Sequence, residues 1–250
     1  MPGFGRLAQP DARDADFPMR ALLEAAPPPA RTSRSWWANG WWGDQGSTSM
    51  CVAYAWTHWL EDGPTTQKGP APVVQPPALY HQAQLVDEWP GEGYDGTSVR
   101  AGAKVLQSQG LISSYHWAAT LDDIVNAVLT VGPVVMGTNW YSGMMAPDET
   151  GLIVPSGPVI GGHAYVIDGV NIKTRLARVK NSWGRHWGRK GFAYLDLAAI
   201  EQVRALGSEV ADANTNADLI DRDSSWAAKK AALELVFTVG RSPGREADYR

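Results

Sequence analysis

The 250-residue sequence has 22 basic and 26 acidic side chains, and its formal net charge of −4 gives no support for a nucleic-acid partner or an acidic membrane surface. No run approaches about 18 consecutive apolar residues, so no membrane span is predicted. The lone cysteine excludes an internal disulfide, favours a reducing, cytoplasmic compartment, and cannot supply a cluster of zinc ligands. No phosphate- or dinucleotide-binding glycine pattern is present, so neither a metal nor a cofactor is expected.

Residues 1–32 are mixed in composition, with a short helical pattern at 20–25 and a Pro-Pro-Pro break at 27–29. No apolar run at the start resembles a signal peptide. We expect these residues to form an N-terminal arm on the surface of the fold, because terminal segments stay loose unless they are tied down.

A loop rich in glycine, serine and threonine ends at Cys51, where a helical pattern of apolar residues begins. A thiol at a helix N-terminus is biased toward the thiolate, since the free N–H groups and the macrodipole favour negative charge. Gln45 lies upstream in the same loop, where its side-chain amide could swing toward the thiol. By itself, a lone cysteine is more often an inert, buried hydrophobe than a nucleophile.

The remaining periodicity is helical first and strand-like afterwards. Helical patterns follow at 77–88, 97–109 and 120–131, the last with Thr120 as its N-cap. Short β-branched or alternating runs then follow at 134–140, 163–170, 176–181 and 191–197. This order predicts an α+β fold of two lobes. Residues 208–223 are polar and acidic and are expected to form a loop.

Three motifs occur in a fixed order: Gln45-Gly46-Ser47 ahead of Cys51, Gly162-His163-Ala164, and Lys180-Asn181-Ser182-Trp183-Gly184 with a second Trp-Gly pair behind it. Over roughly residues 33 to 200 they resemble the papain-like cysteine peptidases. The gaps from Cys51 to the second and third motifs are somewhat shorter than the ~130–150 residues typical of the papain and cathepsin group, so the resemblance is to a short form.

The resemblance implies a catalytic role for four residues. Cys51 would be the nucleophile and His163 the base and acid, with the Asn181 amide oxygen orienting the imidazole. The Gln45 side chain and the Cys51 backbone N–H would hold the oxyanion. Trp183 would cover the His–Asn pair from water. His58 is two helical turns from Cys51, about 10 Å along the axis, and therefore too far to be its base.

The resemblance also implies a peptide groove between the lobes. Gly96 would offer backbone hydrogen bonds to an extended peptide, with Ser98 and Val99 beside it. A pocket for the residue two positions before the scissile bond would be bounded by Val99, Pro133, Gly137, Gly161 and Gly162. Its glycines suggest a roomy, uncharged space, so a large apolar or aromatic side chain is expected there.

The implied architecture is a papain-like fold at 33–207, with a helical lobe at about 45–131 and an antiparallel sheet or barrel lobe at about 132–207. Residues 208–250 form a C-terminal extension without an assigned role. Too few residues precede position 33 for a long inhibitory pro-segment, so the alternative for the arm is a truncated pro-segment that enters the cleft. The family's Cys-Gly-Ser-Cys-Trp around the nucleophile is matched here only at Cys51 itself.

The leading hypothesis is a cysteine peptidase that hydrolyses peptide bonds in extended peptides or unfolded proteins. A second hypothesis keeps the thiol chemistry but assigns a transpeptidase, amidase or isopeptidase, because the acyl-enzyme is common to both. A third is a non-catalytic peptide-binding or structural protein on the same fold.

Overall fold

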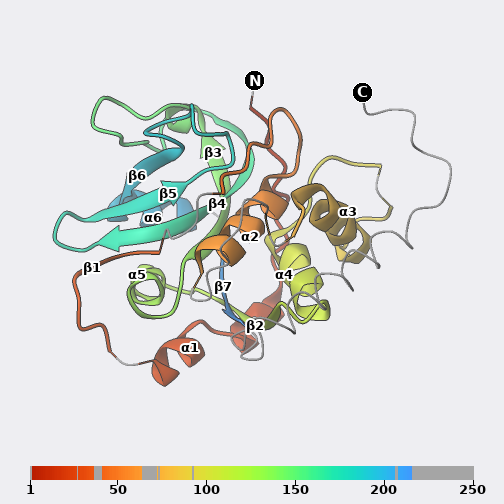
Figure 1. The fold of residues 1–250 in the computed structure, drawn as a ribbon, viewed down its shortest axis with the longest axis horizontal. Helices are drawn as coiled ribbons and strands as arrows, with labels where there is room; N and C mark the ends of the chain where they lie inside the picture. Colours follow the sequence, from red (N-terminus) through yellow and green to blue (C-terminus); the bar gives the residue numbers. More distant parts are fainter. Residues whose placement is uncertain are drawn as a thin grey trace.

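The computed structural model describes residues 2–26, 28–36, 41–63, 72, 74–91, 93–205 and 208–215. The α-helices in these ranges are α1 Arg20–Ala25, α2 Cys51–Asp62, α3 Pro76–Val86, α4 Val99–Ser108, α5 Leu121–Thr130 and α6 Leu197–Ala205. The strands are β1 Ser33–Ser35, β2 Ile112–Trp117, β3 Val134–Tyr141, β4 Val159–Asn171, β5 Leu176–Lys180, β6 Phe192–Asp196 and β7 Glu209–Thr215. Short 3₁₀ turns occur at η1 Ala12–Asp16 and η2 Ser142–Met144. Figure 1 shows α2, α3 and α4 gathered on one side of the molecule and most of the sheet on the other.

The strands of the described chain form one antiparallel sheet in the order β2-β7-β3-β4-β5-β6, with β1 paired to β4. The sheet is open rather than closed into a barrel. The side chains of strand β4 alternate between two cores. Ala164 and Val166 pack toward α2, whereas Tyr165 and Ile167 face the opposite side. The predicted α+β architecture is therefore present, with the sheet lobe in its open form.

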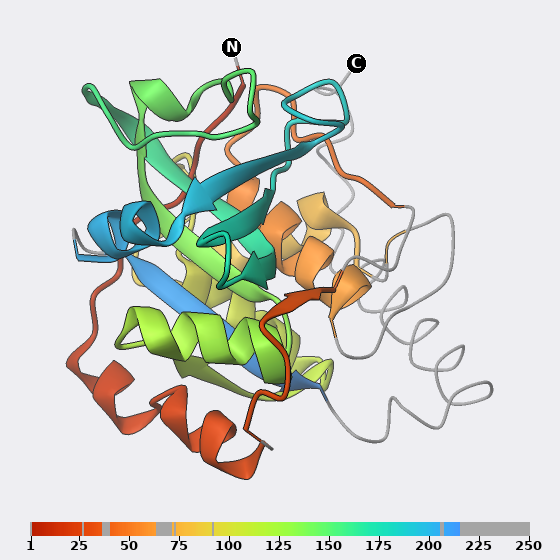
Figure 2. The same ribbon diagram turned by 90° about the vertical axis from the view of Figure 1, so that its left-hand side faces the viewer.

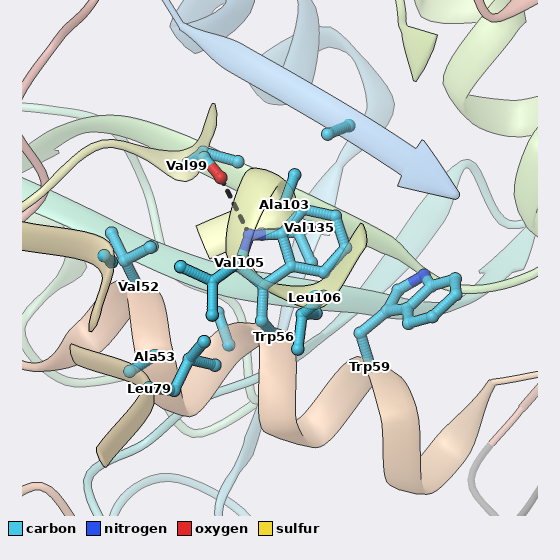
Figure 3. Packing of buried hydrophobic residues seen from close by; sticks show 14 of the residues in the cluster. Val52, Ala53, Trp56, Trp59, Leu79, Val99, Ala103, Val105, Leu106 and Val135 are labelled. Atoms are coloured by element: carbon cyan, nitrogen blue, oxygen red, sulfur yellow. Dashed lines mark hydrogen bonds between the residues drawn. The ribbon is translucent and has the colours of Figure 1, made fainter. Parts of the chain in front are cut away.

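Helix α2 is the centre of the core between the helices and the sheet. Trp56 and Trp59 on this helix are fully buried, and the indole N–H of Trp56 donates to the Val99 carbonyl of α4 at 2.9 Å, as Figure 3 shows. Gly102 of α4 lets the two helices approach, because a Cβ there would lie 2.5 Å from Trp56 Cδ1. Burial of these two large rings fixes α2, and with it Cys51, against the sheet.

Helices α5 and α6 cover the other face of the sheet, which faces the viewer in Figure 2. Thr120 caps α5 as predicted: its hydroxyl accepts from the Asp123 backbone N–H, and the Asp123 carboxylate accepts from the backbone N–H of Thr120. Strand β2 and helix α5, which the sequence places in the helical lobe, pack with the sheet.

Strand β7 differs from the expectation of a loop at 208–223, at least over the residues 209–215 that the structure describes. Its inward residues, Ala211 and Ala213, are small but completely buried, and the Asp212 side chain is buried as well. The strand lies between β2 and β3, so its backbone groups are paired on both sides. The polar composition of this segment therefore did not predict that it is a central strand of the sheet.

Candidate active site

Cys51 is the first residue of α2, and its thiol is completely buried. Burial raises the pKa of Cys51 to about 12, although the backbone N–H groups of Ala164, Val52 and Arg6 oppose the shift. The expected bias toward thiolate at the helix N-terminus is therefore outweighed by desolvation in this conformation. Because Ala164 follows His163 on β4, its N–H group brings the thiol close to the predicted base.

His163 and Asn181 form the predicted pair. His163 Nε2 lies 2.8 Å from Asn181 Oδ1, and the Ser182 backbone N–H donates to the same Oδ1 at 2.7 Å. A backbone N–H can only donate, so this atom is the amide oxygen and the imidazole proton sits on Nε2. Nδ1 is then the basic nitrogen, and it has no hydrogen-bond partner within the described residues. Burial lowers the pKa of His163 to about 4, while the Asn181 hydrogen bond opposes the shift.

Aromatic rings enclose the imidazole. The Trp183 ring centroid lies 4.7 Å from that of His163, and the Trp140 centroid lies 4.8 Å away. Phe4, from the N-terminal part of the chain, meets the same imidazole edge-on at 5.8 Å. Trp183 therefore has the position predicted for a cover over the His–Asn pair, and Phe4 adds a cover that the sequence did not predict.

Gln45 is held by the residue that follows Asn181. Its Oε1 accepts from the Ser182 hydroxyl at 2.6 Å, and its backbone N–H donates to the Ser182 carbonyl at 2.8 Å. Its Nε2 donates to the carbonyls of Thr48 at 2.7 Å and Gly3 at 3.2 Å. The amide group predicted to hold an oxyanion is thus fixed at one end and offers its N–H groups to carbonyl oxygens at the other.

Residues 3–9, which we call the N-terminal strap, lie along the predicted groove instead of on the surface. The backbone N–H groups of Gly5 and Arg6 donate to the Gly162 carbonyl at 3.0 Å. The Thr97 N–H donates to the Gly5 carbonyl at 2.9 Å. A Cβ on Gly162 would lie 2.1 Å from the Arg6 carbonyl oxygen, so the glycine is required for this close approach. The contacts match the alternative in which this segment enters the cleft.

The other predicted groove residues lie around the strap, with one exception. Gly96 lies against the Gly5 carbonyl, Gly137 lies by the side chains of both Arg6 and Val99, Gly161 lies under the Phe4 ring, and Ser98 donates to Gln9 Oε1. The exception is Pro133, which precedes β3 and whose carbonyl accepts from the indole N–H of Trp59. The predicted groove residues thus lie around the N-terminal strap, whereas the Pro133 carbonyl is hydrogen-bonded to Trp59 of α2.

Glu209 lies beside the predicted groove residue Gly137, a position that the sequence did not indicate. It begins β7, opposite Gly137 of β3, and its Oε2 accepts from Arg6 Nε at 3.0 Å. The two residues are 203 positions apart, so only the completed sheet brings them together. The signal in the sequence is weak, since Glu209 stands in a stretch whose polarity indicates a loop.

The remaining histidines have structural or surface positions. His58 is buried, and its Nε2 accepts from the Gly43 N–H at 3.0 Å. His81 and His186 are exposed. Within the described residues, no three His, Cys, Asp or Glu side chains form a group that could hold a metal ion. None of the helices that the structure describes is long and apolar enough to cross a membrane.

Comparison with known proteins indicates a papain-like fold. Residues 102–205 match the family model described as papain family cysteine protease. The fold is similar to that of xylellain, a cysteine protease from Xylella fastidiosa, with a TM-score of 0.63 at 19% identity over 86% of this chain and 96% of that chain. The chain therefore has a papain-like fold, and its segment 102–205 is similar to the papain family of cysteine proteases. The papain-like segment at 102–205 includes His163 and Asn181, whereas Gln45 and Cys51 precede it.

A second papain-like structure, procathepsin B from Trypanosoma congolense, has a TM-score of 0.63 at 13% identity over 85% of this chain and 86% of that chain. Among curated proteins, an uncharacterized peptidase C1-like protein of Acanthamoeba polyphaga mimivirus is 24% identical over 157 residues, which cover 46% of this chain and 50% of that protein. A 55-residue stretch, 22% of this chain, is 49% identical to 8% of a 4-alpha-glucanotransferase from Mycobacterium tuberculosis. The chain thus spans half or less of the length of these curated relatives.

Proposed function

We propose that this papain-like chain is a cysteine peptidase that hydrolyses peptide bonds in extended peptide or unfolded protein. The net charge of −4 supports a peptide partner over nucleic acid or an acidic membrane surface. The strap supports an extended substrate, because the groove pairs with its backbone through Gly162 and Thr97 much as a sheet edge pairs with a strand.

In the proposed reaction, the Cys51 thiol transfers its proton to His163 Nδ1 and the sulfur attacks the peptide carbonyl carbon. The oxyanion accepts hydrogen bonds from Gln45 Nε2 and the Cys51 backbone N–H. The C–N bond then breaks, the leaving amine takes the proton from His163, and a thioester remains on Cys51. Water hydrolyses the thioester with His163 again as the base, which releases the acid and restores the thiol.

The supporting observation is that one short hydrogen-bond network holds both the base and the oxyanion donor. Asn181 Oδ1 orients His163, and the next residue, Ser182, donates to Gln45 Oε1 at 2.6 Å. The strand end at 180–182 therefore fixes the imidazole and the amide relative to each other. Such preorganisation is the property that acyl transfer requires, since it costs no rearrangement during the reaction.

The strap covers this machinery in the described conformation, so turnover requires that residues 3–9 leave the groove. Withdrawal would return water to Cys51 and His163. The burial that raises the pKa of Cys51 and lowers the pKa of His163 would then be relieved. A thiolate–imidazolium pair is the state that attacks a carbonyl.

The test is intact-protein mass after exposure to an epoxide peptide inhibitor of papain-type enzymes at pH 6, followed by a peptide cleavage assay. With one cysteine in the chain, a thiol-specific adduct reports Cys51. We expect slow single labelling of the native protein, loss of labelling in His163→Ala, and retention in the matched control His116→Ala, which alters a histidine of β2. Cys51→Ser should abolish cleavage while the protein stays folded, and full activity of this variant would refute the mechanism.

A further inference from the structure

A buried ion pair occupies the pocket predicted for substrate side chains. Arg6 Nε lies 3.0 Å from Glu209 Oε2, and the two side chains are only 2% and 6% exposed. The carboxylate belongs to β7, which forms the wall of the groove, and the guanidinium belongs to the strap, which lies in the groove. The ion pair therefore joins the groove wall to the strap. The second carboxylate oxygen, Oε1, has no hydrogen-bond partner among the residues that the structure describes.

The walls of this pocket leave space for a long side chain. A Cβ on Gly137 would lie 3.1 Å from Arg6 Cγ and Nε, and 2.6 Å from Val99 Cγ2. A Cβ on Gly162 would lie 3.5 Å from Arg6 Cδ. The aliphatic part of Arg6 therefore fills the volume that Gly137 and Gly162 leave open, and its guanidinium reaches Glu209 at the far end.

We propose that Glu209 makes this pocket selective for an arginine side chain of the substrate, and that Arg6 is an internal occupant of the same site. By the papain-like correspondence, the selected residue is the one two positions before the scissile bond. The inference deepens, and rests on, the proposed peptidase function. It replaces the expectation of an apolar side chain, which followed from wall residues alone without the acid contributed by β7.

The physical reason is the cost of an unpaired buried carboxylate. A carboxylate removed from water is stabilised by a cation that comes within hydrogen-bonding distance, and the planar guanidinium offers several donors in a geometry that suits both oxygens. Lysine would present a point charge on a longer stem and is expected to bind less well.

Arg100 of α4 is a second cation near Glu209, and its charge lowers the pKa of that carboxylate slightly. The Arg100 guanidinium is already paired with Asp11 at 2.7 Å and with Asp14 at 2.5 Å. Burial raises the pKa of Glu209, whereas Arg6, the largest opposing influence, lowers it. Withdrawal of Arg6 thus leaves Glu209 as a buried acid that lacks its nearest cation.

The first experiment measures this affinity without catalysis, in the full chain with Cys51→Ser. Arg6→Ala empties the pocket, and N-ethylguanidinium is added as a side-chain analogue, with N-ethylammonium as the matched control. At about ten times its Kd, N-ethylguanidinium should raise the Tm by about 3–6 °C. The rise should vanish in Arg6→Ala/Glu209→Gln. Equal shifts with and without Glu209 would overturn the proposal. Arg6→Met, which keeps most of the aliphatic chain, replaces Arg6→Ala if the latter fails to fold.

The second experiment measures selectivity in Arg6→Ala with Cys51 intact. Peptides that differ only two positions before the cleaved bond, with arginine, lysine or leucine, are compared by kcat/KM. We expect arginine to exceed leucine by at least about tenfold, and Glu209→Gln to remove that preference. Cleavage that favours leucine equally in both variants would overturn the inference and leave the peptidase intact. Guanidinium binding without cleavage of any peptide would instead refute the proposed function and retain the pocket.

Discussion

The carbonyl oxygen of Gly3 accepts a hydrogen bond from the side-chain amide of Gln45 at 3.2 Å. The indole N–H of Trp183 donates to the same oxygen at 3.2 Å. Gln45 is the residue proposed to hold the oxyanion, so a backbone carbonyl of the strap accepts the hydrogen bond that we propose for the carbonyl of a substrate. The strap holds the donor group in place, and it also shields Cys51 from solvent.

Displacement of the strap should expose Cys51. Gly5 has a φ of 147°, and a Cβ there would lie 2.0 Å from the Ser49 carbonyl oxygen, so Gly5→Val cannot keep the bound conformation. We expect the alkylation rate of native protein by iodoacetamide to rise at least about tenfold, the factor that corresponds to about 1.4 kcal/mol of lost local stability. Mass spectrometry of the intact protein follows the single thiol.

The matched control is Ala8→Val, which introduces the same valine side chain at an exposed position of the strap. Its alkylation rate should equal that of the wild type. If Gly5→Val also reacted at the wild-type rate while circular dichroism showed a folded protein, the strap would not be what shields the thiol.

The grouping of the candidate site residues could be predicted from sequence, because these residues stand in local motifs. Gln45 and Cys51 share one loop-to-helix junction, and Asn181, Ser182 and Trp183 are consecutive. A motif of this kind preserves the spacing along the chain that geometry demands. Helix α5 was predicted for the same reason, since the cap at Thr120 and the apolar face behind it are both local signals.

The strap and the acidic pocket could not be predicted in this way. Arg6 stands in a stretch of mixed composition and Glu209 in a polar one, both without periodicity, so only the folded chain shows that the two side chains form an ion pair. Strand β7 is paired with β2 and β3 on both sides, and Val210 is the one large apolar side chain among its buried residues Val210, Ala211 and Ala213. Long-range pairing overrides local propensity here.

Protonation of His163 should destabilise the folded protein. Burial lowers the pKa of His163 from 6.5 to about 4, so the unfolded chain binds its proton first and stability falls as the pH drops from about 6.5 toward 4. In urea titrations at pH 7.5 and 5.0, His163→Leu should lose about 2 kcal/mol less free energy of unfolding than the wild type. His58 is also buried with a lowered pKa, but it titrates in both proteins and cancels in the comparison. Equal losses would mean that His163 is hydrated.

Removal of the Gln45 amide should slow the chemical step. In a Gly5→Val background, Gln45→Ala is expected to lower kcat by about 10²–10³ with a smaller change in KM, because the donor acts on charge that develops only in the transition state. Ser182→Ala is the control: it removes the 2.6 Å anchor on Gln45 Oε1 but leaves the donor, so its loss should be smaller. A rise in KM with kcat unchanged would instead mean that Gln45 contacts the substrate equally in the ground state and the transition state.

A buried ion pair joins the end of α2 to the strand that leads into the site. Lys180 Nζ lies 2.5 Å from Asp62 Oδ2, and both side chains are completely buried. Burial raises the pKa of Asp62 to about 6, although Lys180 opposes the shift. Lys180→Met should therefore lower the free energy of unfolding by about 3–5 kcal/mol at pH 8, since it leaves a buried carboxylate without its cation.

The effect should shrink at pH 5, where Asp62 can take up a proton, and the double variant Lys180→Met/Asp62→Leu should recover most of the stability at either pH. Urea denaturation of the wild type, the single variants Lys180→Met and Asp62→Leu, and the double variant gives the coupling energy directly. A double variant as unstable as Lys180→Met would show that the lysine stabilises the fold chiefly through other contacts, such as the Trp42 ring 4.8 Å from its Nζ.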